Sequence, residues 1–238
     1  MKKIVAIVFC LCAAQLAAAQ DSLKVKKFFV GVFASPDLSY RTLSSSSGQT
    51  ASWLIQARNG LEIPAVRYTT GLDFAYQLSK HFTLSLGVLY SSMGYNTKQE
   101  EFEFGPPNNT VAHGYSTYKY NYITVPIRAD FYFTRKKIAP FVTLGASANF
   151  FVNEKSTQYI TYNDGHTDTQ SFSGNNSGLS KCNLQAQAGA GVDFTLGKSH
   201  IRIFPIFRMS FTPMNNKGIL HEYLYLGGLG INYLFGVH

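Results

Sequence analysis

Charged residues are scarce in this 238-residue chain, in which they make up 14% of the total. A soluble domain carries roughly 25%. Aromatic residues account for a further 15%. A water-soluble protein with so little charge and so much Tyr and Phe would be hard to keep dispersed, so the composition counts against that class.

The first 19 residues have the pattern of an export signal. Lys2 and Lys3 precede an apolar run over residues 4–19, which ends in three alanines before Gln20 and Asp21. A short run with small residues at its end is typical of a cleaved signal peptide rather than of a transmembrane anchor. Cleavage would remove two lysines and no acidic residue, so the formal charge would fall from +8 to +6.

Cysteine and long apolar runs are scarce in the rest of the chain. Of the three cysteines only Cys182 lies after residue 19, which excludes an intrachain disulfide. No later stretch approaches 18 consecutive apolar residues, which excludes a membrane protein built from spanning helices. No linker or break in composition divides the mature chain, so we expect a short segment at 20–27 and one domain at 28–238.

Alternation of apolar and polar residues is what the chain has instead. In residues 71–90, GLDFAYQLSKHFTLSLGVLY, one parity is apolar on both sides of the tripeptide Ser79-Lys80-His81. This pattern predicts two strands joined by a tight turn. The same period recurs along the chain, and we expect eight strands, at residues 28–42, 65–78, 82–95, 117–133, 138–151, 183–196, 201–212 and 221–235.

Short and long connections alternate between these strands. The short ones have about three to four residues, and the long ones are rich in Ser, Asn, Gly and Asp, which is typical of solvated loops. Transmembrane barrels have short periplasmic turns and longer external loops. The order therefore predicts an all-β, eight-stranded antiparallel up-and-down transmembrane β-barrel, with long loops at 43–64, 96–116, 152–182 and 213–220.

The two parities of each strand differ in charge. One parity has no charged residue and carries aromatic residues towards its ends, whereas the other mixes small residues with isolated charges. We expect the first to face lipid and the second to fill a narrow lumen. The alternative is a soluble, lipocalin-like carrier in which the apolar parity encloses an apolar ligand.

Seven charged residues share the inward parity and form the candidate site. A buried charge is costly unless it is paired, and arginine binds carboxylates through two parallel hydrogen bonds. Because an eight-stranded barrel is filled by side chains, we interpret these residues as a structural plug rather than as an ion or proton path. They are Asp73, Arg128, Asp130, Asp193, Arg202, Arg208 and Glu222.

Four segments, in this order, resemble the PorT-like group of Bacteroidetes outer-membrane β-barrels. They are SPDLSYRTL, GLDFAYQLSKHFTLSLGVLYSSMGY, YITVPIRADFYF and APFVTLGASANFF, within residues 28–236. The resemblance implies placement in the outer membrane and no set of catalytic residues. It also suggests an accessory role in protein secretion.

A non-catalytic role through the external loops, structural or adhesive, is therefore our expectation. We expect outer-membrane lipids and lipopolysaccharide as partners, with a protein partner at the external loops or the periplasmic face. We expect no cofactor, no bound metal and no nucleic acid, and a monomer. A lipid-modifying barrel enzyme is a third hypothesis, since His113, His166 and His221 share the long-loop end, but no H-x-x-H or C-x-x-C spacing supports it.

Overall fold

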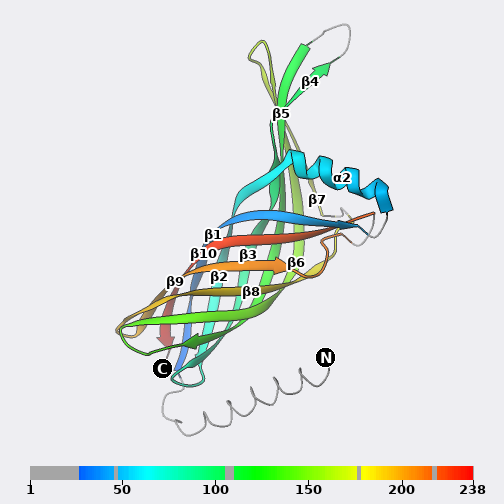
Figure 1. Cartoon of the computed structure of the whole chain (residues 1–238). Helices are drawn as coiled ribbons and strands as arrows, with labels where there is room; N and C mark the ends of the chain where they lie inside the picture. The colour runs from blue at the N-terminus through cyan, green and yellow to red at the C-terminus, as the bar shows by residue number, and fades with distance from the viewer. Residues whose placement is uncertain (1–26, 46–47, 105–109, 176–177, 216–218, 238) are drawn as a thin grey trace.

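The computed structural model describes residues 27–45, 48–104, 110–175, 178–215 and 219–237 (Figure 1). The predicted signal at 1–19 and the segment at 20–27, except for Lys27, lie outside the described residues. Within them the secondary structure is almost entirely strand. The elements are β1 (Lys27–Ser45), α2 (Gly48–Leu61), β2 (Glu62–Gln77), β3 (Phe82–Thr97), β4 (Glu100–Phe104), β5 (Thr110–Tyr132), β6 (Ile138–Tyr162), β7 (Thr167–Gly174), β8 (Cys182–Leu196), β9 (Ser199–Ser210) and β10 (Leu220–Val237).

Eight of these strands close into a ring of antiparallel neighbours. The order is β1, β2, β3, β5, β6, β8, β9 and β10, and β10 pairs with β1. Following the pairing once around the ring from Val30 leads back to Tyr40, ten residues farther along β1. Such an offset tilts the strands against the barrel axis. The predicted all-β, eight-stranded up-and-down barrel is thus confirmed.

Three of the predicted long loops contain regular structure, so our description of them as plain loops was wrong. The loop at 43–64 holds α2, and the loop at 96–116 holds β4 and the start of β5. The loop at 152–182 holds β7 and the last part of β6. β7 is almost wholly polar and β4 spans only five residues, so neither shows the sustained apolar alternation on which strand prediction depends.

β5 and β6 continue well beyond the ring and carry β4 and β7 on their outer sides (Figure 1). A bulge between Asn121 and Tyr122 shifts the register near the point where β6 separates from β8, whereas β5 stays paired with β3 as far as Thr117. We call the four-stranded extension the outer sheet; it comprises β4, residues 110–116 of β5, residues 153–162 of β6, and β7. Its spatial order is β4-β5-β6-β7.

The apolar parity of the barrel strands faces outward. Leu72, Leu86 and Val88 are about half exposed, whereas Asp73 is fully buried. Aromatic pairs occur at two levels of this outer surface. Tyr68–Tyr90 and Tyr40–Tyr225 lie towards the long-loop end, and Phe28–Phe74, Phe131–Phe133 and Tyr233–Phe235 lie towards the short turns.

Glycines on the inward parity make room for large side chains inside the ring. A Cβ atom on Gly230 would lie 2.9 Å from the ring of Phe204, and Gly191 faces the same residue from β8. Phe204 packs with Phe33 and Phe141 in a buried cluster. Within the part of the chain that the structure describes, no helix is both long and apolar enough to cross a membrane.

Candidate functional site: the charged lumen and the outer sheet

All seven predicted lumen residues are buried, with exposed fractions of 5% or less. They come from β2, β5, β8, β9 and β10, because the inward parity of each strand carries polar residues at the matching heights. Five of them pair among themselves: Asp73 with Arg128, and Asp130 and Asp193 with Arg202. Arg208 and Glu222 instead pair with charged residues that we did not predict.

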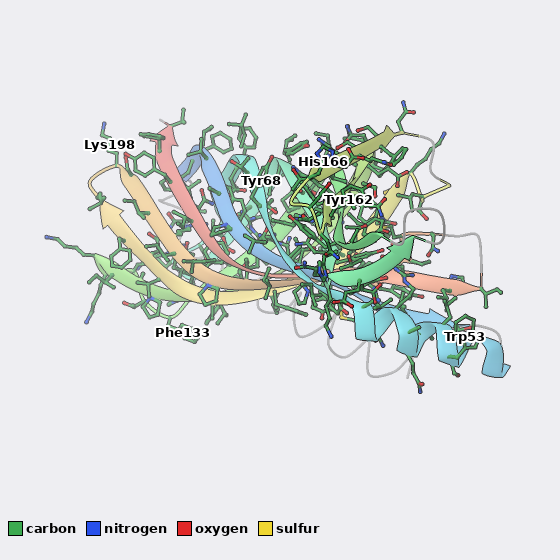
Figure 2. All side chains as sticks on the ribbon, turned by 90° about the horizontal axis from the view of Figure 1, so that it is seen from above. Trp53, Tyr68, Phe133, Tyr162, His166 and Lys198 are labelled. Carbon is green, nitrogen blue, oxygen red and sulfur yellow. The ribbon has the colours of Figure 1, made fainter. Side chains whose placement is uncertain are left out.

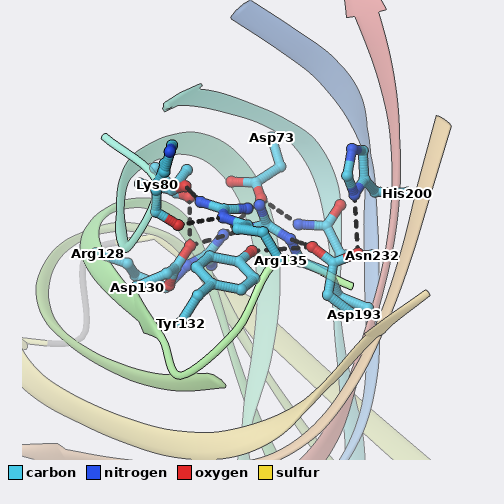
Figure 3. A network of polar contacts seen from close by, with 12 residues as sticks. Asp73, Lys80, Arg128, Asp130, Tyr132, Arg135, Asp193, His200 and Asn232 are labelled. Carbon is cyan, nitrogen blue, oxygen red and sulfur yellow. Dashed lines mark hydrogen bonds and ion pairs between the residues drawn. The ribbon is translucent and has the colours of Figure 1, made fainter. Parts of the chain in front are cut away.

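The layer nearest the short turns is centred on Arg202. Its neighbours Asp130, Tyr132, Asp193 and His200 are labelled in Figure 3. The Nη1 atom of Arg202 lies 2.9 Å from Asp130 Oδ2, and its Nε lies 3.2 Å from Asp193 Oδ2. The hydroxyl of Tyr132 also donates to Asp193, and His200 Nδ1 lies 2.8 Å from the other oxygen of that carboxylate. Each buried charge therefore has at least one opposite charge and further hydrogen bonds, which offset its desolvation.

Asp73 and Arg128 form the next layer. Arg128 Nη2 lies 2.5 Å from Asp73 Oδ2, and the side-chain amide of Asn232 donates to the same oxygen. The guanidinium of Arg128 also lies over the ring of Phe33. This ion pair joins β2 to β5 on the inner side of β3, the strand that lies between them.

Asp37 is the partner of Arg208, and sequence reasoning missed it. Arg208 Nη1 lies 3.0 Å from Asp37 Oδ2. The hydroxyls of Ser35 and Thr69 each donate to Asp37 at 2.6 Å. The sequence does contain a pattern that places Asp37 in the lumen, because Asp37 shares its parity with small and polar residues of the predicted strand 28–42. Two large apolar residues on the same parity, Phe29 and Phe33, made that parity look like the lipid-facing one.

Four charges close the lumen at the long-loop end. Arg41 and Arg58 both bind Glu62, at 2.5 and 2.6 Å, and Arg58 also reaches Glu222 at 3.2 Å. Burial alone would lower the pKa of Arg58, but its hydrogen bond to Glu62 and the nearby charge of Glu222 outweigh that effect and raise the pKa. Because Arg58 belongs to α2, these ion pairs fasten the end of the helix to the barrel.

The lumen is filled rather than open. Among the described residues that form these ion pairs are six carboxylates and five arginines, so the charges nearly balance; the carboxylates are Asp37, Glu62, Asp73, Asp130, Asp193 and Glu222, and the arginines are Arg41, Arg58, Arg128, Arg202 and Arg208. Large buried side chains such as Tyr122 and Tyr132 occupy the space between them.

A family model agrees with this architecture over most of the chain. The model of the outer membrane protein beta-barrel domain matches residues 18–216. The chain belongs to this family. No curated protein sequence matches it.

Solved barrels of the outer membrane are similar to this family member over most of their length. OprG from Pseudomonas aeruginosa has 12% sequence identity and a TM-score of 0.40, over 91% of this chain and 98% of that one. Neisserial surface protein A has 13% identity and a TM-score of 0.36, over 86% and 95%. Ail of Yersinia pestis has 11% identity and a TM-score of 0.31, over 88% and 97%.

The three histidines that we placed at the long-loop end of this outer-membrane barrel lie on different elements. His113 lies on β5, where its Nδ1 is 3.8 Å from Glu101 Oε1, and His166 stacks on Tyr162 before β7. His221 lies on β10. Within the described part of the chain, no three His, Cys, Asp or Glu side chains gather into a group that could hold a metal ion.

The outer sheet presents aromatic side chains at the same end. Tyr115 and Tyr159 stack across β5 and β6 with their ring centroids 4.8 Å apart, and Phe172 on β7 is 64% exposed. β4 and β7 are the edge strands of the sheet. An edge strand offers unpaired N–H and C=O groups that another chain can use. The sheet is therefore suited to binding another polypeptide.

Proposed function

We propose that the protein is an integral outer-membrane barrel that acts by contact rather than by catalysis, with the outer sheet as its working surface. The observation that carries this proposal is the four-stranded sheet that continues beyond the ring and ends in two edge strands. Extended segments of partner proteins add to such edges through main-chain hydrogen bonds. We propose a protein partner at this surface, and a monomeric barrel.

Insertion into the membrane is supported by the outer surface of the barrel. The apolar side chains lie between two levels of aromatic residues, as in transmembrane barrels. A soluble carrier of an apolar ligand would need this apolar parity inside, and the structure has it outside. We propose that the signal at 1–19 is cleaved on export, that the short turns face the periplasm, and that lipids and lipopolysaccharide surround the barrel.

The lumen network acts as a structural plug in this proposal. Each of the seven residues has an ion-pair partner, and the charges of the network nearly balance. A plug of this kind holds the strands together and blocks conduction. The finer assignment to the PorT-like group, with an accessory role in secretion, is a further part of the proposal and is supported by the motif order alone.

Photo-crosslinking in intact cells tests the contact role. A benzoylphenylalanine is placed at Phe172 or Tyr159 in the outer sheet, and at Leu86 in the apolar surface as a matched control. We expect discrete protein adducts from the first two positions and none from the third. Protein adducts from all three positions, or from none, would contradict a working surface on the sheet.

A trimmed protein provides the second arm. Residues 100–114 and 157–171 are each replaced by an Asn-Gly turn, which removes the top of the outer sheet and leaves the eight-stranded ring. We expect the trimmed chain to fold, as judged by heat-modifiable migration on gels, and to lose the adducts at the retained Phe172. Hydrolysis of outer-membrane lipids by the purified full chain would favour the enzyme hypothesis instead.

A further inference from the structure

The two edges of the outer sheet differ in length and in charge. β4 spans five residues, and three of them are glutamates, Glu100, Glu101 and Glu103. β7 spans eight residues, of which Asp168 is the only charged one, and its residues 169–173 are all exposed. A short strand and charged side chains are the usual protections of a sheet edge against further pairing. β7 has little of either, so it is the edge that is open to an added strand.

The turn before β7 determines which backbone groups of the strand point outward. Gly165 has a φ of +84° and donates its N–H to the carbonyl oxygen of Tyr162, whose own N–H donates to the carbonyl oxygen of His166 (Tyr162 and His166 are labelled in Figure 2). Such a loop, with glycine in the left-handed region, is common in hairpins. Along an antiparallel ladder, residues that bond to the neighbouring strand alternate with residues that do not. Counted from His166, the N–H and C=O groups of Thr169 and Ser171 therefore point away from β6, and no described strand pairs with them.

One face of this edge carries an aromatic ring between two carboxylates. Asp168, Phe172 and Gly174 share the face, and Phe172 is 64% exposed. Glu154 of β6 lies opposite Gly174, on which a Cβ atom would be 3.6 Å from the carboxylate. Because glycine has no side chain, the way from the open edge to Glu154 is clear. Neither Asp168 nor Glu154 forms an ion pair with a described cation.

We propose that β7 binds an extended, antiparallel segment of a partner protein that is basic at two defined positions. Residues directly opposite each other on neighbouring strands interact, and opposite charges there stabilise the pairing. A lysine or arginine of the partner faces Gly174 and reaches Glu154, an aromatic or β-branched residue faces Phe172, and a second cation faces Asp168. In the chain order of the partner, the first cation precedes the apolar residue by two positions and the second cation follows it by four.

This inference rests on the proposed contact role of the outer sheet, and it assigns that role to one edge and one kind of partner. Main-chain hydrogen bonds to Thr169 and Ser171 supply affinity, as in other complexes formed by strand addition. The two carboxylates and Phe172 supply specificity, because they favour one register of the added segment over a shift by one residue.

A labelled peptide of the predicted pattern, TKTFTTVKT, tests the register. Its binding to the full chain folded in micelles of an uncharged detergent is followed by fluorescence polarisation. The control peptide TTKFTTKVT has the same composition, but its lysines lie on the other face of the strand. We expect the first peptide to bind about tenfold more tightly than the control, and equal binding would overturn the proposal.

Main-chain pairing is tested at Ser171. Ser171→Pro removes an N–H that points away from β6, a position at which an edge strand tolerates proline, whereas Ser171→Ala keeps that N–H. We expect the proline variant to bind the first peptide at least about tenfold more weakly and the alanine variant to bind it as the unchanged protein does. Equal affinities of the two variants would show that no strand is added at β7.

A charge exchange identifies the edge. We expect Asp168→Lys to bind the first peptide about fivefold more weakly and to recover affinity for TKTFTTVET, in which glutamate replaces the second lysine. Glu101→Lys makes the same change of charge on β4 and should leave both affinities unchanged. If Glu101→Lys weakened binding and Asp168→Lys did not, the assignment to β7 would be wrong although the contact role would stand. Heat-modifiable migration verifies folding in every variant, and the adducts formed in intact cells test the contact role separately.

Discussion

Buried charges inside a narrow barrel are stable only in matched sets. Asp73 has no exposed surface, yet its carboxylate receives a guanidinium and a side-chain amide. Removing one partner of such a pair leaves an uncompensated buried charge, which costs more than the pair itself contributes. The lumen therefore depends on each of its charged members, although their net contribution to stability is modest.

We expect Asp73→Asn to lower the free energy of unfolding by about 3–5 kcal/mol, because Arg128 would remain charged and unpaired. Urea titration of the barrel refolded in lipid vesicles, followed by the gel migration of the folded form, measures this. Asp168→Asn on β7 is the matched control, because no described cation forms an ion pair with Asp168. Equal stability of the two variants would show that the buried pair is not required.

At this scale the sequence predicts which residues face inward but not how they pair. Parity alone places Arg128 and Asp73 in the lumen, and the sequence offers either Arg128 or Arg208 as the partner of Asp73. The choice depends on the register between strands that are far apart in the chain. That register also brings Arg58 to Glu222, and a helix residue carries no parity signal at all.

At the scale of elements, neighbouring glycines on β10 have opposite requirements. A Cβ atom on Gly228 would overlap Asp37 Oδ1 and lie 2.8 Å from the backbone oxygen of Pro36, whereas a Cβ on Gly227 would meet nothing within 4 Å. Gly228 faces the lumen and Gly227 faces outward. One residue along the strand thus separates a crowded position from an open one.

Gly228→Ala is expected to lower the free energy of unfolding by about 1–3 kcal/mol, as overpacking does. The reason is that β10 must move away from β1 to make room for the added methyl group. Gly227→Ala is expected to leave stability nearly unchanged. Thermal unfolding of the two variants in the same micelles, followed by circular dichroism, checks this. A stable Gly228→Ala protein would contradict the register between β1 and β10.

Arg58→Gln is expected to release α2 from the barrel, since Arg58 is the helix residue that binds both Glu62 and Glu222. Trp53, the only tryptophan of the chain, lies on the exposed side of α2 (Figure 2) and reports its motion. We expect lower fluorescence anisotropy of Trp53 and a loss of stability of about 1–3 kcal/mol, because Glu222 would be left buried without its cation. Gln56→Ala, at an exposed position of the same helix, should leave the anisotropy unchanged.

The barrel strands were predictable as elements because one face of each meets an apolar environment. In β3 the predicted bounds 82–95 differ from Phe82–Thr97 only at the end. In β6, by contrast, the prediction stopped at residue 151 and the strand continues to Tyr162. Beyond the bulge the residues of the strand are mostly polar, so no sustained apolar alternation marks it. α2 was missed for the same reason, because its face towards the barrel is held by charges rather than by an apolar stripe.

On the scale of the whole molecule, one arrangement explains the composition, the closed ring and the filled lumen. The low content of charge reflects a surface that is apolar around the barrel, and the remaining charges are either paired inside it or placed in the turns and the outer sheet. The central claim is that alternate residues of each strand face lipid and the intervening residues face the lumen.

Collision accessibility of nitroxide labels along β3 tests this claim most directly. Single cysteines are introduced into a Cys182→Ser background and labelled in the barrel reconstituted into lipid vesicles. We expect labels at Leu84, Leu86 and Val88 to be accessible to oxygen dissolved in the bilayer, and labels at Thr83 and Ser85 to be shielded from it. Accessibility that is uniform along the strand, or highest at Thr83 and Ser85, would contradict the account.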